Sequence, residues 1–214
     1  MNLLEQNAKD IAEEFGVEVL PFACDITKTE NVIAAVQATI ERFGRVDILV
    51  NNAGTGAVAN AEDITDEQFK HEMDIDLFGT FVCAREFGKE MIKAKYGRII
   101  NIASMYGLVG NMIVGSSPYH AAKGGVVNLT RALAAEWGKH GITVNSICPG
   151  YFYTDLTTAT LDSDYFQALA KSNIPMQRYG KSGELDSCAI FLASPSSTYV
   201  NGQNIAVDGG YTCV

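Results

Sequence analysis

The stretch GRIINIASMYGLVGNMIVGSSPYHAAK, residues 97–123, decides how the chain folds. Its apolar run at 99–102 is typical of a buried strand in a parallel sheet. Ser104 stands at the end of that strand, and a loop broken by glycines leads into a helix that carries Tyr119 and Lys123. We predict that these three polar side chains are the catalytic groups.

The spacing around Tyr119 supports this prediction. Ser117 and Pro118 are typical of a helix start, because a serine caps free N–H groups and proline is tolerated at the first helical position. Tyr119 and Lys123 then lie one turn apart on one helical face, where an ammonium favours the phenolate and lowers the tyrosine pKa towards neutrality. Tyr119 would therefore act as an acid or base, while the Ser104 hydroxyl holds a substrate oxygen.

Length and charge limit the class of protein. The chain has 214 residues, of which 47% are hydrophobic, and this suits one domain, 1–214, with a single core. Its net charge of −9 would repel nucleic-acid backbones and anionic membranes, so we expect neither as a partner. No apolar run approaches the ~20 residues of a membrane span and the start carries no signal-sequence pattern, so we expect a cytoplasmic protein.

The cysteines and histidines do not suggest a metal site. The five cysteines are scattered and contain no C-x-x-C pair, so we expect reduced thiols that pack as small hydrophobes. The three histidines do not stand at metal-ligand spacing from one another. The sequence therefore predicts neither a zinc nor an iron site.

Helical and strand patterns alternate along the chain. Helices are predicted at 2–15, 30–43, 65–95, 118–138 and 182–193, and strands at 17–24, 46–50, 99–102, 143–148 and 203–210. Thr65 and Gln68 predict a capping box at the start of the long helix, which we expect to bend near Gly79. The alternation predicts an α/β fold, a doubly wound parallel sheet with helices on both faces.

Two segments follow predicted strand ends, where open parallel sheets bind ligands. The turn Asn51-Asn52-Ala53-Gly54 is, taken alone, an ordinary polar turn, although its small residues would permit close approach of a flat cofactor. The segment 151–181 is rich in aromatic and hydroxyl side chains, and it suits a mobile lid over the substrate.

Six phrases occur in the order typical of the short-chain dehydrogenase/reductase family, which the chain resembles from about Val17 to its end. They are CD at 24–25, DILVNNAG at 47–54, the strand end at Ser104, YHAAK at 119–123, TVNSICPG at 143–150 and NIAVDGG at 204–210. The resemblance implies a Rossmann-like fold and hydride transfer between NAD or NADP and a carbonyl or secondary alcohol. It assigns Tyr119 as general acid/base, Lys123 as the group that lowers its pKa and binds ribose, and Ser104 as the holder of the substrate oxygen.

The resemblance also implies contacts with the cofactor. Asp25 matches the residue beside adenine, and the residues at 51–54 match a wall of the cofactor site. The full set implied is Asp25, Asn51, Ala53, Gly54, Tyr119, Lys123, Pro149, Gly150 and Thr154. Asp76 stands where the family has an asparagine whose backbone carbonyl holds a proton-relay water, so Asp76 is expected to support the relay if its carbonyl is the group that matters.

The start of the sequence departs from that family. It lacks the usual first two strands and first helix, with the glycine-rich turn that receives the cofactor pyrophosphate. In the family's strand order the absent strands would lie between 17–24 and 46–50 and leave a gap of roughly 14 Å. Either 17–24 shifts to pair with 46–50, or another chain covers the gap, or the sequence is an N-terminally truncated product of a longer gene.

Within the family, the run at 129–156 and the ending VDGGYT most resemble gluconate 5-dehydrogenase-like and related polyol dehydrogenases. This implies a sugar acid or polyol as the small-molecule substrate. A 3-oxoacyl-carrier-protein reductase is an alternative, although an acidic carrier would be met better by basic residues. A catalytically silent structural chain without cofactor binding is another. The resemblance implies a homodimer or homotetramer and leaves the choice between NAD and NADP open.

Overall fold

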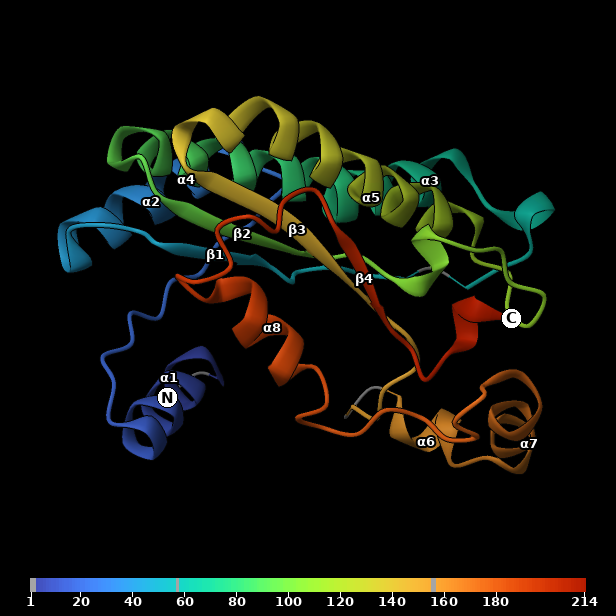
Figure 1. Cartoon of the computed structure of the whole chain (residues 1–214). Coiled ribbons are helices and arrows are strands. Elements are labelled where there is room, and N and C mark those ends of the chain that lie inside the picture. Colours follow the sequence, from blue (N-terminus) through green and yellow to red (C-terminus); the bar gives the residue numbers. More distant parts are fainter. Residues whose placement is uncertain (1–2, 57, 155–156) are drawn as a thin grey trace.

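The computed structural model describes residues 3–56, 58–154 and 157–214 and shows layered helices and strands (Figure 1). Four parallel strands form one sheet in the order β1-β2-β3-β4. Their bounds are Ile48–Asn51 for β1, Gly97–Ile102 for β2, Ile142–Pro149 for β3 and Asn204–Val207 for β4. The predicted α/β fold with a Rossmann-like parallel sheet is confirmed.

Helices lie on both sides of this sheet (Figure 1). On one side are α2 (Thr29–Phe43), α3 (Asp66–Glu72), α4 (Thr80–Ala94) and α5 (Ser117–Trp137), and on the other are α1 (Leu3–Phe15) and α8 (Asp186–Ala193). Two short helices, α6 (Thr158–Leu161) and α7 (Asp164–Asn173), follow β3, and 3-10 turns occupy 61–63, 105–107, 138–140 and 211–213. Among the described helices, none combines the length and the hydropathy that crossing a bilayer requires.

The central strands β2 and β3 hold the core. Ile99 and Val144 pack with Met91 in one cluster, and Ile100 packs with Leu192 of α8 in another. Neighbouring residues of β2 enter different clusters because side chains alternate between the two faces of a strand. Burial on both faces explains why this strand is a continuous apolar run in the sequence.

The long helix predicted at 65–95 forms in three parts. The predicted capping box is confirmed, because the Thr65 Oγ1 accepts from the Gln68 N–H at 3.2 Å and the Gln68 Oε1 accepts from the Thr65 N–H at 2.9 Å. Between α3 and α4 the chain makes a π-helical turn, Met73–Gly79, which ends at the residue near which a bend was expected. Such turns are rare and occur often at functional sites, and this one contains the buried Asp76.

The segment 17–24 is not a strand, contrary to the prediction. It pairs with no strand, and no described segment pairs with β1 on the side away from β2. A strand needs a neighbour to receive its backbone hydrogen bonds, and an apolar pattern does not provide one. Ile48 and Val50 of β1 are therefore 45% and 49% exposed, and α1 has no buried residue. The alternative in which 17–24 pairs with 46–50 is not found in this structure.

Smaller differences concern the ends of elements. The last helix begins at Asp186 rather than at 182, and β4 ends at Val207 rather than at 210. Helix α5 begins at Ser117, so the cap position falls on Ser116, whose side chain makes no capping hydrogen bond. The helix start was therefore predicted correctly, but the capping serine was not.

The segment 151–181, of which residues 155 and 156 lie outside the described residues, is more regular than its sequence suggests. It contains α6 and α7, and an isolated parallel bridge joins Phe152 to Gly180. Leu161, Ala170 and Tyr179 form a buried cluster within it, separate from the sheet core. The aromatic residues of the segment thus provide a local core of their own.

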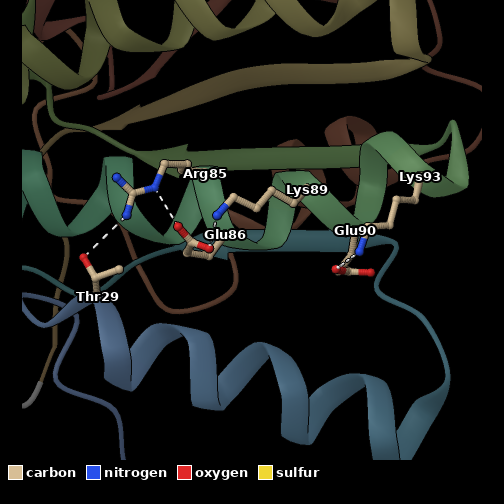
Figure 2. A network of polar contacts seen from close by, with 6 residues as sticks. All are labelled: Thr29, Arg85, Glu86, Lys89, Glu90 and Lys93. Carbon is tan, nitrogen blue, oxygen red and sulfur yellow. Dashed lines mark hydrogen bonds and ion pairs between the residues drawn. The ribbon is translucent and has the colours of Figure 1, made fainter.

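A polar network joins α4 to the start of α2 (Figure 2). The Glu86 carboxylate accepts from the Arg85 Nε at 2.6 Å and from the Lys89 Nζ at 2.5 Å. Arg85 also donates to the Thr29 hydroxyl of α2 at 3.4 Å. One turn further along α4, the Lys93 Nζ donates to Glu90 at 2.7 Å.

Candidate active site

Two elements bring the predicted catalytic side chains together. Ser104 follows β2 directly, and Tyr119 lies in the first turn of α5, which packs against β3. Both residues line a cavity of about 620 Å³, together with Gly150 at the end of β3. Because the strands are parallel, their carboxyl ends meet at one edge of the sheet, and the cavity lies there.

Hydrogen bonds position the two hydroxyl groups that face this cavity. The Ser104 Oγ accepts from the Tyr106 N–H at 3.1 Å, and the Ser104 hydroxyl acts to lower the pKa of Tyr119. In place of a serine cap, the Ser116 carbonyl accepts from the His120 Nδ1 at 2.8 Å and ties down the first turn of α5. The start of α5 is thus held by a contact that Ser117 and Pro118 alone did not predict.

Lys123 lies behind Tyr119 in a buried position. Its Nζ donates to the Ile102 carbonyl at 3.2 Å and lies 3.8 Å from the Asp76 Oδ2 and 5.4 Å from the centroid of the Tyr119 ring. Burial lowers the pKa of Lys123, and the negative charges of Asp76 and Glu72 oppose that change.

The pKa of Tyr119 is raised, whereas the sequence predicted that it is lowered. Burial is the largest cause; the hydrogen bond with Ser104 acts in the opposite direction, and the charges of Asp76 and Glu72 raise the pKa further. The prediction considered the Lys123 ammonium alone. The carboxylates of Asp76 and Glu72 also act on the phenol. The prediction assumed a positive charge near Tyr119, and these two negative charges offset it.

Asp76 and Glu72 are one helical turn apart and both are buried, at 0% and 1% exposure. The Asp76 Oδ1 accepts from the Thr55 N–H at 2.9 Å, and its backbone carbonyl accepts from the Thr80 Oγ1 at 2.8 Å. Asp76 therefore contacts Lys123 through its side chain and holds the turn after β1. Glu72 was missed by the sequence analysis, although its place one turn before Asp76 was a usable signal.

The turn after β1 comes very close to these groups. A Cβ added to Gly54 would lie 2.8 Å from the Asp76 Oδ1 and 3.3 Å from the Lys123 Nζ. Only glycine fits there without a shift, because real Cβ atoms do not approach neighbours so closely. Asn51, the last residue of β1, is opposite Asn101 of β2, and its Nδ2 donates to the Asn101 Oδ1 at 2.8 Å and thereby ties β1 to β2.

A second cavity, of about 380 Å³, lies on the other side of this turn. Its lining includes Asp25, Ala53 and Gly54, whereas Gly56 lines the first cavity. The Asp25 carboxylate accepts from the Thr27 N–H at 3.0 Å and from its hydroxyl at 2.6 Å, and these hydrogen bonds lower the pKa of Asp25. Three of the residues assigned to the cofactor are thus brought together here.

The remaining assigned residues lie after β3. Pro149 ends the strand, and the Gly150 N–H donates to the Val207 carbonyl at 3.0 Å. A Cβ on Gly150 would lie 2.7 Å from the Asp208 Cα, so a glycine is needed for the two strand ends to approach. Thr154 is exposed, pairs with the Thr157 hydroxyl at 2.9 Å and lines neither cavity.

Two tyrosines of the first cavity were not among the predicted site residues. The Tyr106 and Tyr151 hydroxyl oxygens lie 2.5 Å apart, and both rings line the cavity. Tyr106 also stacks on His120 with ring centroids 4.6 Å apart. Tyr106 is two residues after Ser104, and Tyr151 is one residue after Gly150. Both could have been predicted as site residues, because residues just past the ends of parallel strands face the ligand crevice.

Comparison with known proteins places this geometry in context. A family model described as enoyl-(acyl carrier protein) reductase matches residues 1–212. Galactitol 2-dehydrogenase (L-tagatose-forming) of Cereibacter sphaeroides is 39% identical over 202 residues, which are 94% of this chain and 79% of that protein. D-threitol dehydrogenase of Mycolicibacterium smegmatis is 39% identical over 191 residues, 89% of this chain and 72% of that protein. The crystal structure of a gluconate 5-dehydrogenase from Burkholderia cenocepacia in complex with NADP and tartrate superposes with a TM-score of 0.92 at 35% identity, covering 98% of this chain and 81% of that one.

Proposed function

Because the chain belongs to the short-chain dehydrogenase/reductase family and is an oxidoreductase, we propose that it interconverts a secondary alcohol and a ketone on a sugar acid or polyol with NAD or NADP. One observation carries the proposal. Ser104 and Tyr119 line the wall of one cavity, the Ser104 hydroxyl acts to lower the pKa of Tyr119, and Lys123 is buried behind them. This arrangement supports a role for both hydroxyl groups at one substrate oxygen, with Tyr119 as the proton donor or acceptor.

The two cavities support cofactor binding across the turn after β1. Gly54 lets this turn lie directly against Asp76 and Lys123, because a side chain at that position would collide with the Asp76 carboxylate. Asp25 and Ala53 would contact the adenosine portion, and Lys123 and Gly150 the nicotinamide riboside portion. A bound nicotinamide supplies hydride to a ketone or accepts it from an alcohol.

The residues of the chain would handle the proton. In the direction of ketone reduction, Tyr119 gives its hydroxyl proton to the substrate oxygen while Ser104 donates a hydrogen bond to that oxygen. The raised pKa of Tyr119 keeps the phenol protonated at neutral pH, which suits this direction. In alcohol oxidation the phenolate accepts the proton, with Lys123 as the nearby cation and Asp76 as a relay group 3.8 Å from the ammonium.

The segment 151–181 is proposed as the lid of this site. Five of its residues line the catalytic cavity, namely Tyr151, Thr157, Thr160, Leu161 and Phe166. A segment with its own small core can move over the cavity as a unit, and closure would exclude water from the reacting atoms.

The first test is calorimetric titration of the protein with NADH and with NADPH, followed by turnover assays on polyols and sugar acids. Tyr119→Phe removes the proton-transferring hydroxyl, so kcat is expected to fall by about 10²–10⁴-fold while the melting temperature is unchanged. Tyr199→Phe makes the same chemical change at a fully exposed ring and is the matched control. Turnover by Tyr119→Phe within threefold of the parent protein would exclude the proposed role.

A further inference from the structure

We propose that the catalytic cavity selects neutral polyols and their ketoses over sugar acids, and that Tyr106 and Tyr151 bind a substrate hydroxyl group beyond the reacting carbon. This inference rests on the proposed function and narrows its substrate class. It concerns two hydroxyl groups of the cavity wall other than those of Ser104 and Tyr119.

The cavity wall has no charged side chain among the described residues. The lining residues are Gly56, Val58, Ser104, Met105, Tyr106, Val114, Ser116, Tyr119, Gly150, Tyr151, Thr157, Thr160, Leu161 and Phe166. A carboxylate that leaves water for such a wall loses hydration and gains no cation in return. Sites that recognise carboxylates usually provide an arginine or lysine, so this wall is a poor match for a sugar acid.

The cations nearest in sequence to the wall are engaged or face solvent. Arg178, the guanidinium of the segment 151–181, forms a bidentate pair with Glu184 at 2.7 and 2.8 Å. Lys171 and Lys181 of the same segment are exposed. Hence none of these three side chains is available to neutralise an anion inside the cavity.

The charges behind the reacting end also oppose an anion. Lys123 is accompanied by two buried carboxylates, Asp76 and Glu72, whose negative charge already acts on Tyr119. The whole chain adds a net charge of −9. Electrostatic steering therefore favours uncharged substrates over anionic ones of the same size.

The Tyr106–Tyr151 pair offers what a neutral hydroxyl group requires. When one tyrosine hydroxyl donates to the other across 2.5 Å, the accepting oxygen keeps its own proton and both oxygens keep lone pairs. The pair can thus both donate to and accept from a substrate hydroxyl. Stacking of Tyr106 on His120 and the edge contacts of Tyr151 with Phe166 and Tyr179 hold the rings in place before binding.

The test compares substrates that differ only at one end of the chain. Galactitol is paired with galactonate and D-glucitol with D-gluconate, because each pair exchanges a hydroxymethyl group for a carboxylate. Binding is measured by saturation-transfer NMR and turnover by kcat/KM. We expect at least a tenfold preference for each polyol in both measurements. Equal or stronger binding of the sugar acids overturns the inference, and so does failure of all four compounds to bind at 100 mM (about the weakest range such NMR detects).

Binding and turnover separate this inference from the proposed function. Preferential polyol binding without any Tyr119-dependent turnover would support the wall assignment and overturn the proposed reaction. Turnover that favours sugar acids would do the reverse. Each of the two hypotheses can therefore fail without the other.

Three variants test the wall itself. Tyr106→Phe and Tyr151→Phe keep the rings but remove one hydroxyl, so KM for polyols should rise by about five- to tenfold while kcat changes less than twofold. Val114→Arg places a cation on the wall from a half-buried position and should raise kcat/KM for the sugar acids by about tenfold.

Controls exclude a folding effect. Tyr165→Phe removes a hydroxyl from an exposed ring of α7 that does not line the cavity, and it should behave as the parent protein. Circular dichroism confirms that each variant is folded. A Tyr106→Phe variant that is folded and loses kcat without any change in KM would contradict a role in substrate binding, as would a Val114→Arg variant with unaltered selectivity.

Discussion

The β2–β3 side of the sheet and the β1 side differ in how completely they are covered. On β2, Ile99 is 1% exposed beneath α4 and α5, whereas on β1 Ile48 is 45% exposed at an edge that no described strand pairs with. Ser104, Tyr119 and Lys123 all lie on elements of the covered side. Asp25, by contrast, follows the unpaired segment 17–24.

This difference separates the reaction centre from part of the cofactor site. A buried strand and the helix packed on it hold the catalytic hydroxyls in fixed positions, because side chains in a packed core have few alternatives. The residues assigned to adenosine depend on backbone with few buried neighbours, which opens locally at lower free energy. We therefore expect changes on the two sides to affect different quantities.

The largest effect on stability is expected when isoleucine is replaced by alanine, once on each side. Ile99→Ala removes a fully buried side chain and should lower the free energy of unfolding by about 2–5 kcal/mol. Ile48→Ala, at the exposed edge, should lower it by less than about 1 kcal/mol. Urea denaturation at equal protein concentration measures both. Equal losses would mean that the β1 edge is covered in solution and would remove the contrast between the two sides.

The second prediction concerns the charges behind Tyr119. Asp76→Asn keeps an oxygen that can accept from the Thr55 N–H but removes a negative charge that raises the pKa of Tyr119. Alcohol oxidation requires the phenolate, so its rate falls as the pH drops through that pKa. The midpoint of the pH–rate profile should therefore move to lower pH in the variant.

Asp74→Asn is the control for this measurement. It removes a carboxylate from the same π-helical turn at a side chain that lines the second cavity rather than the catalytic one. Its midpoint should stay near that of the parent protein. An Asp76→Asn midpoint that is unchanged or moves to higher pH would show that this carboxylate does not set the proton affinity of the phenol.

The fold could be predicted from the sequence in those segments where burial produces a recognisable pattern of apolar residues. The strand at 99–102 and the helix that carries Tyr119 were found because a doubly buried strand is an apolar run and proline is tolerated in the first turn of a helix. The prediction of a strand at 17–24 was wrong because it rested on the apolar pattern of that segment alone, without a neighbouring strand to pair with it. A segment forms a strand only when a second segment pairs with it, and the residue pattern of one segment does not show whether such a partner is present.

The site shows the same division between local and non-local information. Ser104, Tyr119 and Lys123 carry a local spacing and were predicted, and their catalytic roles stay predictions. The direction of the Tyr119 pKa shift was predicted wrongly because it depends on burial and on Glu72, which lies 47 residues away and packs nearby only in the folded chain. Tyr106 and Tyr151 were missed since their contact joins two strand ends that are distant in sequence.

The smallest effect is expected in the polar network that joins α4 to α2 (Figure 2). Burial alone would raise the pKa of Glu86, but its hydrogen bonds with Lys89 and Arg85 lower it on balance. A carboxyl group with a lowered pKa stabilises the fold above the ordinary carboxyl range and loses that contribution as the pH falls through the lowered pKa. Glu86→Gln should therefore lower the melting temperature by about 2–4 °C at pH 7 and by progressively less at acidic pH.

Glu90→Gln is the control variant for this measurement. Glu90 pairs with Lys93 on the same helix at 2.7 Å, but its side chain is 28% exposed, against 6% for Glu86. Water screens the more exposed pair, so its loss should change the melting temperature by less than about 1 °C. If the two variants melt alike at pH 7, the network between α4 and α2 contributes no more than an ordinary surface pair, and the packing of α2 on α4 depends on apolar contacts alone.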